Sequence, residues 1–232
     1  MVLFVFVLNQ TMHLRFFVGL IASIAAVAAA APCYGRLNET IPFEEVCYTV
    51  LKNGTDGLSL RKYGASGAAM LVEYQASSSI TVYQEALTLT TFYVIEYFLG
   101  PGNVHNDSLL SARTVPLVLR PPTPAHNFWV AHMALAPSRY PPATPPAPYA
   151  PTTLRPLGEN TTLAVQRATL AQSPQPSDFD ALCAKLSAGI KEQLPGWSVD
   201  TDSPYTPSHA RYYSYYNYEG PWTIECWMGV AA

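Results

Sequence analysis

Hydrophobic and polar residues alternate in some stretches of the chain, and this alternation is richest where β-branched and aromatic residues gather. Such a pattern is typical of strands that bury one face. The strands that it predicts cover residues 43–51, 58–63, 68–74, 109–119, 127–135, 163–170 and 210–230. The turn Lys52-Asn53-Gly54 predicts a hairpin between the first two, and Pro116 places its strand at a sheet edge or a bulge.

Two other stretches repeat their apolar positions at helical spacing. One starts within residues 79–85, has apolar positions continuing at 83, 87, 94, 95 and 98, and is ended by Gly100-Pro101. The other has Ser177 as a hydroxyl cap, an apolar stripe from Phe179 to Leu194, and Pro195-Gly196 as its end. Because each helix is flanked by extended segments on both sides, the order of elements predicts an α+β domain built from two similar halves.

Proline is concentrated in residues 121–156, which contain eleven of the 21 prolines. We expect an extended, polyproline-II-like passage there. We interpret it as a solvent-exposed connection between the two halves. The alternative is that a partner domain binds its proline motifs.

The amino terminus has the order of residues found in secretory signals. Arg15 is followed by an apolar run from Phe16 and then by the small residues Ala28-Ala29-Ala30. The run up to Ala31 is shorter than the roughly 20 residues that span a bilayer. We therefore expect 1–30 to be a signal peptide and 31–232 a single domain that is secreted and not stably inserted in a membrane. An uncleaved signal anchor and a plastid-directed route are the alternatives.

Four cysteines remain after such cleavage, an even number that suits two disulfides in an oxidising compartment. We expect the pairs Cys33–Cys47 and Cys183–Cys226, although four cysteines allow three connectivities and Cys183 can also be a buried free thiol. Four Asn-x-Ser/Thr sequons also remain and predict a glycoprotein: Asn38, Asn53, Asn106 and Asn160.

Composition excludes several classes of protein. Thirteen Lys and Arg against 16 Asp and Glu leave a net charge of -3, so the chain lacks the basic excess of a nucleic-acid binder. No polybasic run suggests binding to a membrane surface. With 49% hydrophobic residues, the chain is also too apolar to be disordered.

Motifs for catalysis and metal binding are missing from the sequence. It has no G-x-S-x-G, H-E-x-x-H, phosphate-loop, dinucleotide or C-x-x-C pattern, so we expect a protein that is not an enzyme and has no metal site. His126 and His132 share one side of the strand predicted at 127–135 and can flank one apolar patch. Two half-exposed histidines are the simpler interpretation.

Several short motifs, taken in chain order, resemble the SOUL/haem-binding-protein family. The resemblance spans roughly residues 43–230 and rests on Leu60–Tyr63 (LRKY), Phe92–Asn103 (FYVIEYFLGPGN), Leu110–Pro116 (LSARTVP), Pro145-Pro146, Tyr215–Tyr218 (YYNY) and Glu225–Trp227 (ECW). The chain departs from the family at Ser59-Leu60, where members have Glu, at Arg113, where they have Met, and at Ile224, where they have Asn. The family's F-x-G motif is also not visible after Val165.

This resemblance implies a distorted antiparallel β-barrel of two similar halves flanked by two α-helices, built from a duplicated βαββ-type unit. It also implies non-catalytic binding of haem or another tetrapyrrole as a small hydrophobic ligand. Arg61 and Arg113 are then the residues expected to meet propionates, and His126 and His132 those to test as iron ligands. The alternatives are a glycosylated extracellular interaction protein that keeps the fold but not the haem site, and a carrier of another amphipathic ligand. No protein partner is indicated.

Overall fold

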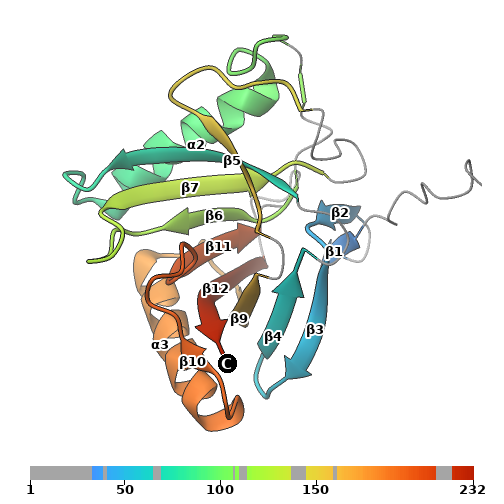
Figure 1. The fold of residues 1–232 in the computed structure, drawn as a ribbon, viewed down its shortest axis with the longest axis vertical. Coiled ribbons are helices and arrows are strands. Elements are labelled where there is room, and N and C mark those ends of the chain that lie inside the picture. Colours follow the sequence, from blue (N-terminus) through green and yellow to red (C-terminus); the bar gives the residue numbers. More distant parts are fainter. Residues whose placement is uncertain are drawn as a thin grey trace, which may run out of the picture. The chain divides into compact units, whose positions relative to one another are not determined.

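The protein folds as a curled antiparallel β-sheet with two helices, an α+β arrangement (Figure 1). The computed structural model describes residues 33–38, 41–64, 69–106, 108–109, 114–136, 145–158, 161–212 and 221–232, without the side chains of 33–43. The chain divides into two units, Met1–Ala31 and Pro32–Ala232. The description below concerns the second.

The large sheet has ten strands, nine of which form one continuous path. In spatial order these are β3 (Tyr48–Asn53), β4 (Leu58–Tyr63), β9 (Thr162–Leu170), β12 (Trp222–Ala231), β11 (Ser208–Tyr212), β6 (Leu117–Arg120), β7 (Phe128–Ala134), β5 (Met70–Ser77) and β8 (Thr153–Pro156). The tenth, β10 (Ser198–Val199), pairs with β12. A separate two-stranded sheet is formed by β1 (Cys33–Asn38) and β2 (Ile41–Glu45).

Each helix covers a different part of the large sheet. Helix α2 (Tyr83–Leu99) packs on β5 and β7, and helix α3 (Pro176–Gln193) packs on β12 and β9 (Figure 1). Phe98 of α2 and Leu186 of α3 are fully buried in the two resulting cores. Because side chains alternate across a strand, these cores use one face of the sheet only.

The opposite face of the sheet has an apolar cluster of its own, and we call it the inner face. On β6, Leu117 and Leu119 join the core under α2, whereas Val118 between them belongs to the inner face with Trp227 and Tyr63. The central strand β6 is thus buried on both sides, which fits its apolar composition, whereas β3 at the edge is largely exposed.

Three predicted strands differ from the observed ones, and the one expected at 210–230 covers parts of two paired strands, β11 and β12. The strand expected at 43–51 is broken at Val46 and Cys47 into β2 and β3. In the described part of the strand expected at 109–119, Leu117–Leu119 lies in β6, while Val115 forms an isolated parallel bridge with Glu45.

Part of the proline-rich passage lies in the large sheet. β7 lies in the interior of the sheet between β6 and β5, and β8 pairs with β5. Between them, Pro146 is buried and its carbonyl oxygen accepts a hydrogen bond of 2.8 Å from the hydroxyl of Tyr97. Within 145–156 only Pro146 and Thr152 are buried, and the other residues are exposed or half-buried, so the solvent-exposed connection stays a prediction.

The end of α2 explains one of the family-like motifs. Gly100 has a φ of 117° and its backbone N–H donates to the carbonyl of Glu96. A Cβ atom on Gly102 would lie 2.6 Å from the backbone nitrogen of Tyr97. Asn103, fully buried, donates from Nδ2 to the carbonyl of Tyr97 at 2.8 Å. The LGPGN sequence is thus a helix terminus that only small residues and an amide can close.

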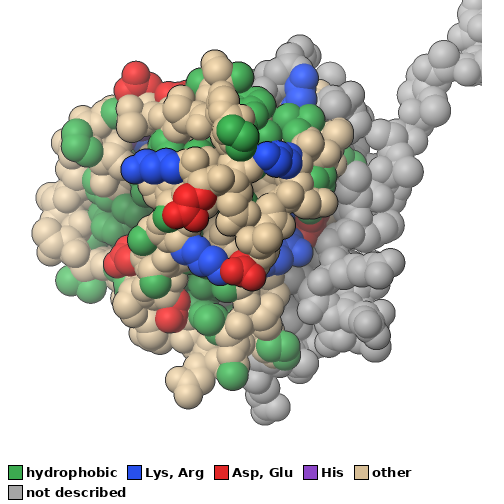
Figure 2. Space-filling model, turned by 90° about the horizontal axis from the view of Figure 1, so that it is seen from below, with side chains coloured by type: hydrophobic (Ala, Val, Ile, Leu, Met, Phe, Trp, Pro, Cys, Tyr) green, Lys and Arg blue, Asp and Glu red, His purple; other side chains and the backbone are tan. Residues whose placement is uncertain are grey.

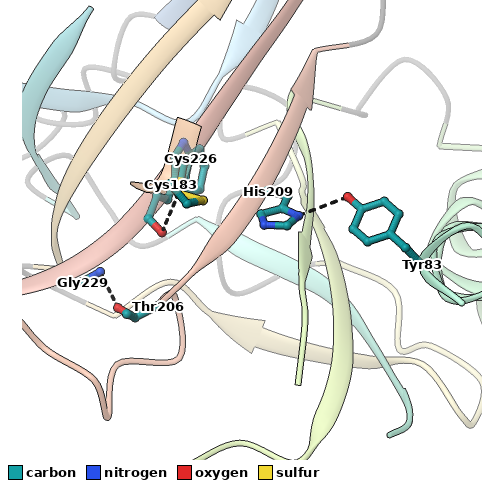
Figure 3. The surroundings of a disulfide bond; sticks show 7 residues. Tyr83, Cys183, Thr206, His209, Cys226 and Gly229 are labelled. Atoms are coloured by element: carbon teal, nitrogen blue, oxygen red, sulfur yellow. Dashed lines mark hydrogen bonds between the residues drawn. A yellow bond between two sulfur atoms is a disulfide. The ribbon is translucent and has the colours of Figure 1, made fainter. Parts of the chain in front are cut away.

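The Cys183–Cys226 disulfide predicted from the sequence is present and joins α3 to β12 (Figure 3). Cys47 is also disulfide-bonded. The side chain of Cys33 lies outside the described part of the chain, so the pair Cys33–Cys47 stays a prediction.

Charged side chains are sparse on the surface as well as in the sequence. On the face that Figure 2 shows, Lys and Arg are interspersed with Asp and Glu among hydrophobic and uncharged polar side chains. Within the described residues, no helix is both long and apolar enough to cross a membrane.

Candidate functional site

A small pocket opens on the inner face of the sheet, with a cavity volume of about 30 Å³. Aromatic and aliphatic side chains form most of its wall, and three polar residues join them. The lining residues are Glu45, Val46, Tyr63, Leu71, Thr114, Val115, Pro116, Val118, His132, Ala134, Leu157 and Trp227.

Strands from both ends of the sheet position the wall of the pocket. Tyr63 is the last residue of β4 and Trp227 lies on β12, with ring centroids 6.0 Å apart. His132 and Val118 face each other across β7 and β6. The pocket therefore lies where residues far apart in the sequence meet, which is where ligand sites commonly form.

Two segments border the pocket. The backbone N–H of Val115 donates to the carbonyl of Glu44 at 3.2 Å, next to the parallel bridge between Glu45 and Val115. Thr114 is held in turn by its hydroxyl, which donates to the carbonyl of Ala134 at 2.7 Å. The Val115–Glu44 hydrogen bond and the Glu45–Val115 bridge thus attach the segment before β3 to the pocket rim.

Beside the pocket lies a buried network centred on Glu225 of β12. Its carboxylate is 2.9 Å from Nη2 of Arg61 and 2.7 Å from Nε of Arg167. It also accepts hydrogen bonds from the hydroxyl of Tyr212 at 3.0 Å and from Nε1 of Trp227 at 2.7 Å. Glu225 has no exposed surface. These donors compensate the burial of a charge that would otherwise be very costly.

The carboxylates of this network have pKa values that move in opposite directions. Burial alone would raise the pKa of Glu225, but Arg61 and Arg167 outweigh it and hold that pKa below its usual value. Burial, and then the charge of Glu225, raise the pKa of Glu45 to about 6, although Arg167 lies 3.8 Å away. Glu225 is therefore a fixed anion, whereas Glu45 on the pocket wall gains or loses a proton near neutrality.

A second polar cluster lies on the inner face around Glu73 of β5. Glu73 accepts from Nε of Arg155 at 2.9 Å and from Nε2 of Gln75 at 3.0 Å. Arg155 also donates to the hydroxyl of Tyr205 at 3.3 Å, and the ring of Tyr205 meets that of His132 edge-on. Burial lowers the pKa of His132 to about 4, so its imidazole is neutral at pH 7.

The structure separates the residues that the sequence singled out. Arg61 is buried, donates from Nη1 and Nη2 to Glu225 and from Nε to the hydroxyl of Ser59, and its guanidinium lies 4.3 Å from the ring centre of Tyr48. Its contact with a propionate stays a prediction. Arg113 lies outside the described residues. Arg61 thus stabilises the pocket indirectly, through its ion pair with Glu225.

Of the two histidines, only His132 lines the pocket. His126 precedes β7 rather than lying on it, and its Nε2 is 2.8 Å from the carbonyl oxygen of Asp202. The shared apolar patch was therefore a wrong expectation, because the strand begins two residues later. In the described ranges, no cluster of three His, Cys, Asp or Glu is placed to hold a metal ion.

The predicted glycosylation sites fall into two groups. Asn53 at the end of β3 and Asn106 after α2 are exposed. The side chain of Asn38 and all of Asn160 lie outside the described part of the structure. The two visible asparagines are thus accessible to a modifying enzyme.

Sequence reasoning missed the members of the network other than Arg61: Glu45, Arg167, Tyr212 and Glu225. One signal was present in WTIECWMGV, where Glu225 alternates in step with Trp227 on an otherwise apolar strand. A charge at a position whose parity predicts burial requires a partner. Which arginine supplies it depends on strand pairing that the sequence does not show.

Comparison with known proteins identifies no relative by sequence. No family model and no curated protein matches the chain. Solved structures with similar folds include a protein bound to tetraphenylphosphonium (12% identity, TM-score 0.39, 75% of this chain and 93% of that one) and a transcription-regulation protein from Staphylococcus aureus (12%, 0.38, 81% and 100%). Another is a hydrolase from Listeria innocua (9%, 0.39, 71% and 87%). Likenesses this weak carry no argument about function.

Proposed function

We propose that the protein binds a small amphipathic ligand at the inner-face pocket without catalysing a reaction, and that haem or a related tetrapyrrole is the first ligand to test. The observation that carries this proposal is the pocket wall itself, in which Tyr63 and Trp227 stand opposite the neutral imidazole of His132. Apolar walls with a few placed polar groups are typical of ligand sites. We place this activity outside the cell, after secretion.

The size of the cavity determines how such a ligand would enter. Ligand sites commonly measure roughly 300–1,000 Å³, whereas this cavity measures about 30 Å³. A tetrapyrrole therefore requires the segment at Glu45 and Val46 to move from the rim, where backbone contacts to Val115 hold it. Binding would open the pocket, and the free protein would keep it closed.

His132 is the candidate iron ligand. It faces the pocket from the middle of the sheet, and a neutral imidazole offers the lone pair that iron requires. A histidine with a pKa near 4 keeps this lone pair down to acidic pH. His126 does not line the pocket.

The family resemblance would make the sheet a product of duplication, and the strand order supports that proposal. Reading from the two ends, β4-β9-β12-β11 mirrors β8-β5-β7-β6, with the central contact between β11 and β6. Each set of four includes the strand before one helix and a strand after it: β5 and β6 for α2, and β9 and β11 for α3, where the short β10 lies between α3 and β11. The pocket would then lie between two equivalent halves.

Hemin titration of the purified mature protein tests the proposal. We expect a saturable Soret band with micromolar or tighter affinity, and quenching of Trp227 emission. His132→Ala should shift the band and weaken binding at least tenfold. His209→Ala is the matched control, because His209 is equally buried but lies against Phe179 on the other face of the sheet. Weak, non-saturating adsorption by the wild type would reject tetrapyrrole binding.

A second candidate function is favoured by the small cavity and by the exposure of Asn53 and Asn106. In this alternative the protein is a glycosylated extracellular interaction protein that keeps the fold without the haem site. Hemin would then fail to saturate, while enzymatic deglycosylation would still lower the mass of the secreted protein. Displacement of lipophilic dyes would instead indicate a carrier of another amphipathic ligand.

A further inference from the structure

Two polar side chains on neighbouring strands of the inner face have buried atoms with no hydrogen-bond partner in the described part of the protein. Nε and Nη1 of Arg120 on β6 are buried and unpaired within the described part of the protein, and so is Oγ of Ser208 on β11. Arg120 is 6% exposed and Ser208 has no exposed surface. Buried groups of this kind are rare, and each one calls for a ligand, a water or a functional explanation.

Strand pairing brings the two side chains together. His209 pairs with Leu119 and Ala210 with Val118, so Ser208 and Arg120 occupy the next position of the same register. Ala210 and Val118 belong to the inner-face cluster. Since side chains two residues apart share a face, Arg120 and Ser208 lie on that face as well.

The charge around Arg120 is not balanced, unlike the charge around Glu225. Glu225 and Glu45 meet two cations, Arg61 and Arg167. In the cluster around Glu73, the carboxylate already binds Arg155 and Gln75.

The other titratable group there, His132, is uncharged at pH 7, and burial lowers the pKa of the Arg120 guanidinium itself. In this cluster, the buried Glu73 and Arg120 and the half-buried Arg155 together therefore carry one more positive charge than negative charge. An uncompensated guanidinium is costly there, and an anion would relieve that cost.

We propose that Arg120 and Ser208 form a binding site for a carboxylate, and that this carboxylate belongs to the ligand of the inner-face pocket. The inference deepens the proposed function by assigning the ligand an anionic arm. Two unpaired guanidinium N–H groups and a hydroxyl are the donors that a carboxylate accepts from.

The site lies next to the pocket along the sheet. Val118 and His132 line the pocket and pair with each other, and Arg120 pairs with Val130 in the following inner-face position. Two residues along a strand span about 6.7 Å. A ligand with its apolar part beside Trp227 could therefore extend a carboxylate past His132 to Arg120.

The first experiment uses acetate and inorganic phosphate as probes in thermal unfolding. Wild type should show a saturable rise of the unfolding midpoint with acetate, and Arg120→Met should abolish it. The same substitution should leave the anion-free protein as stable as wild type or more stable, because it removes an unpaired buried charge. Arg211→Met is the control, since Arg211 is also buried but lies 5.0 Å from the ring centre of Phe179 on the opposite face.

A second experiment separates a free-anion site from one that serves the pocket ligand. Hemin and its dimethyl ester differ only in the two carboxylates. If the ligand's arm reaches Arg120, wild type binds hemin at least tenfold more tightly than the ester, and Arg120→Met removes that difference while leaving ester affinity unchanged.

The outcomes distinguish the two proposals. If neither hemin nor its ester binds, but the acetate response requires Arg120, tetrapyrrole binding is rejected and the carboxylate site is retained. An acetate response that persists in Arg120→Met, or a large loss of anion-free stability in that variant, overturns the carboxylate site.

Discussion

Nη2 of Arg61 lies 2.9 Å from Oε1 of Glu225, although β9 separates their strands in the sheet. The pair joins β4 to β12 across an intervening strand, and Arg167 of that strand binds the same carboxylate. One buried anion thus ties three strands together directly beside the pocket wall. Charge pairing as well as apolar packing therefore holds these three strands together on the inner face.

Breaking this network from the anionic side should be the most damaging change. Glu225→Gln leaves Arg61 and Arg167 without their shared carboxylate, and we expect a loss of about 3–5 kcal/mol in unfolding free energy, measured by denaturant titration. Arg61→Met should cost less, because Arg167 still meets Glu225. If Glu225→Gln is as stable as wild type, the network is not stabilising.

His209 should contribute to the pH dependence of the free energy of unfolding. Burial, and then the charge of Arg211, lower the pKa of His209 from 6.5 to about 4. Between these values the unfolded chain binds a proton that the folded protein does not, so stability falls as pH drops from 6.5 to 4. The shift corresponds to about 3 kcal/mol. His209→Phe should reduce the slope over this range and leave the part contributed by His132, whose pKa is also lowered to about 4, and His105→Phe, at an exposed position, is the control.

Glu45 should make the free energy of unfolding change with pH in the direction opposite to that of His209. Its pKa is raised from 4.5 to about 6, so the folded protein holds a proton that the unfolded chain releases. The stabilisation that this provides is complete below pH 4.5 and is lost as pH rises through 6. Glu45→Gln should therefore show a steeper rise of stability between pH 4.5 and 6 than wild type, with a difference of about 2 kcal/mol across the range. Parallel curves for the two proteins would contradict this expectation.

Alternation and helical spacing were enough to predict the main elements. The strand expected at 58–63 is β4 with the same bounds, and the helix expected to start within 79–85 and to end at Gly100 is α2. Both depend on local signals, a turn at Asn53-Gly54 and a Gly-Pro stop. Local signals cannot show which strands become neighbours, because pairing depends on the fold as a whole.

The site was harder to predict than the fold for the same reason. Arg61 was singled out but given a ligand to bind, since nothing in the sequence places it beside Glu225, 164 residues further on. Arg120 looked like any other arginine until β6 was found next to β11. The closed pocket rim depends on Glu45 meeting Val115, which no local pattern encodes.

The turn after α2 allows a sharp test of what the family-like LGPGN motif does. In Gly102→Ala the added Cβ would lie 2.6 Å from the nitrogen of Tyr97 and 2.8 Å from the carbonyl carbon of Glu96. Both are backbone atoms of a packed helix, so neither can move aside cheaply. We expect a loss of about 2 kcal/mol or more in unfolding free energy by denaturant titration. Gly158→Ala is the matched control, because its Cβ would meet only the side-chain oxygen of Thr161, at 3.3 Å. If both variants lose the same small amount, the motif is not a steric requirement of the helix end.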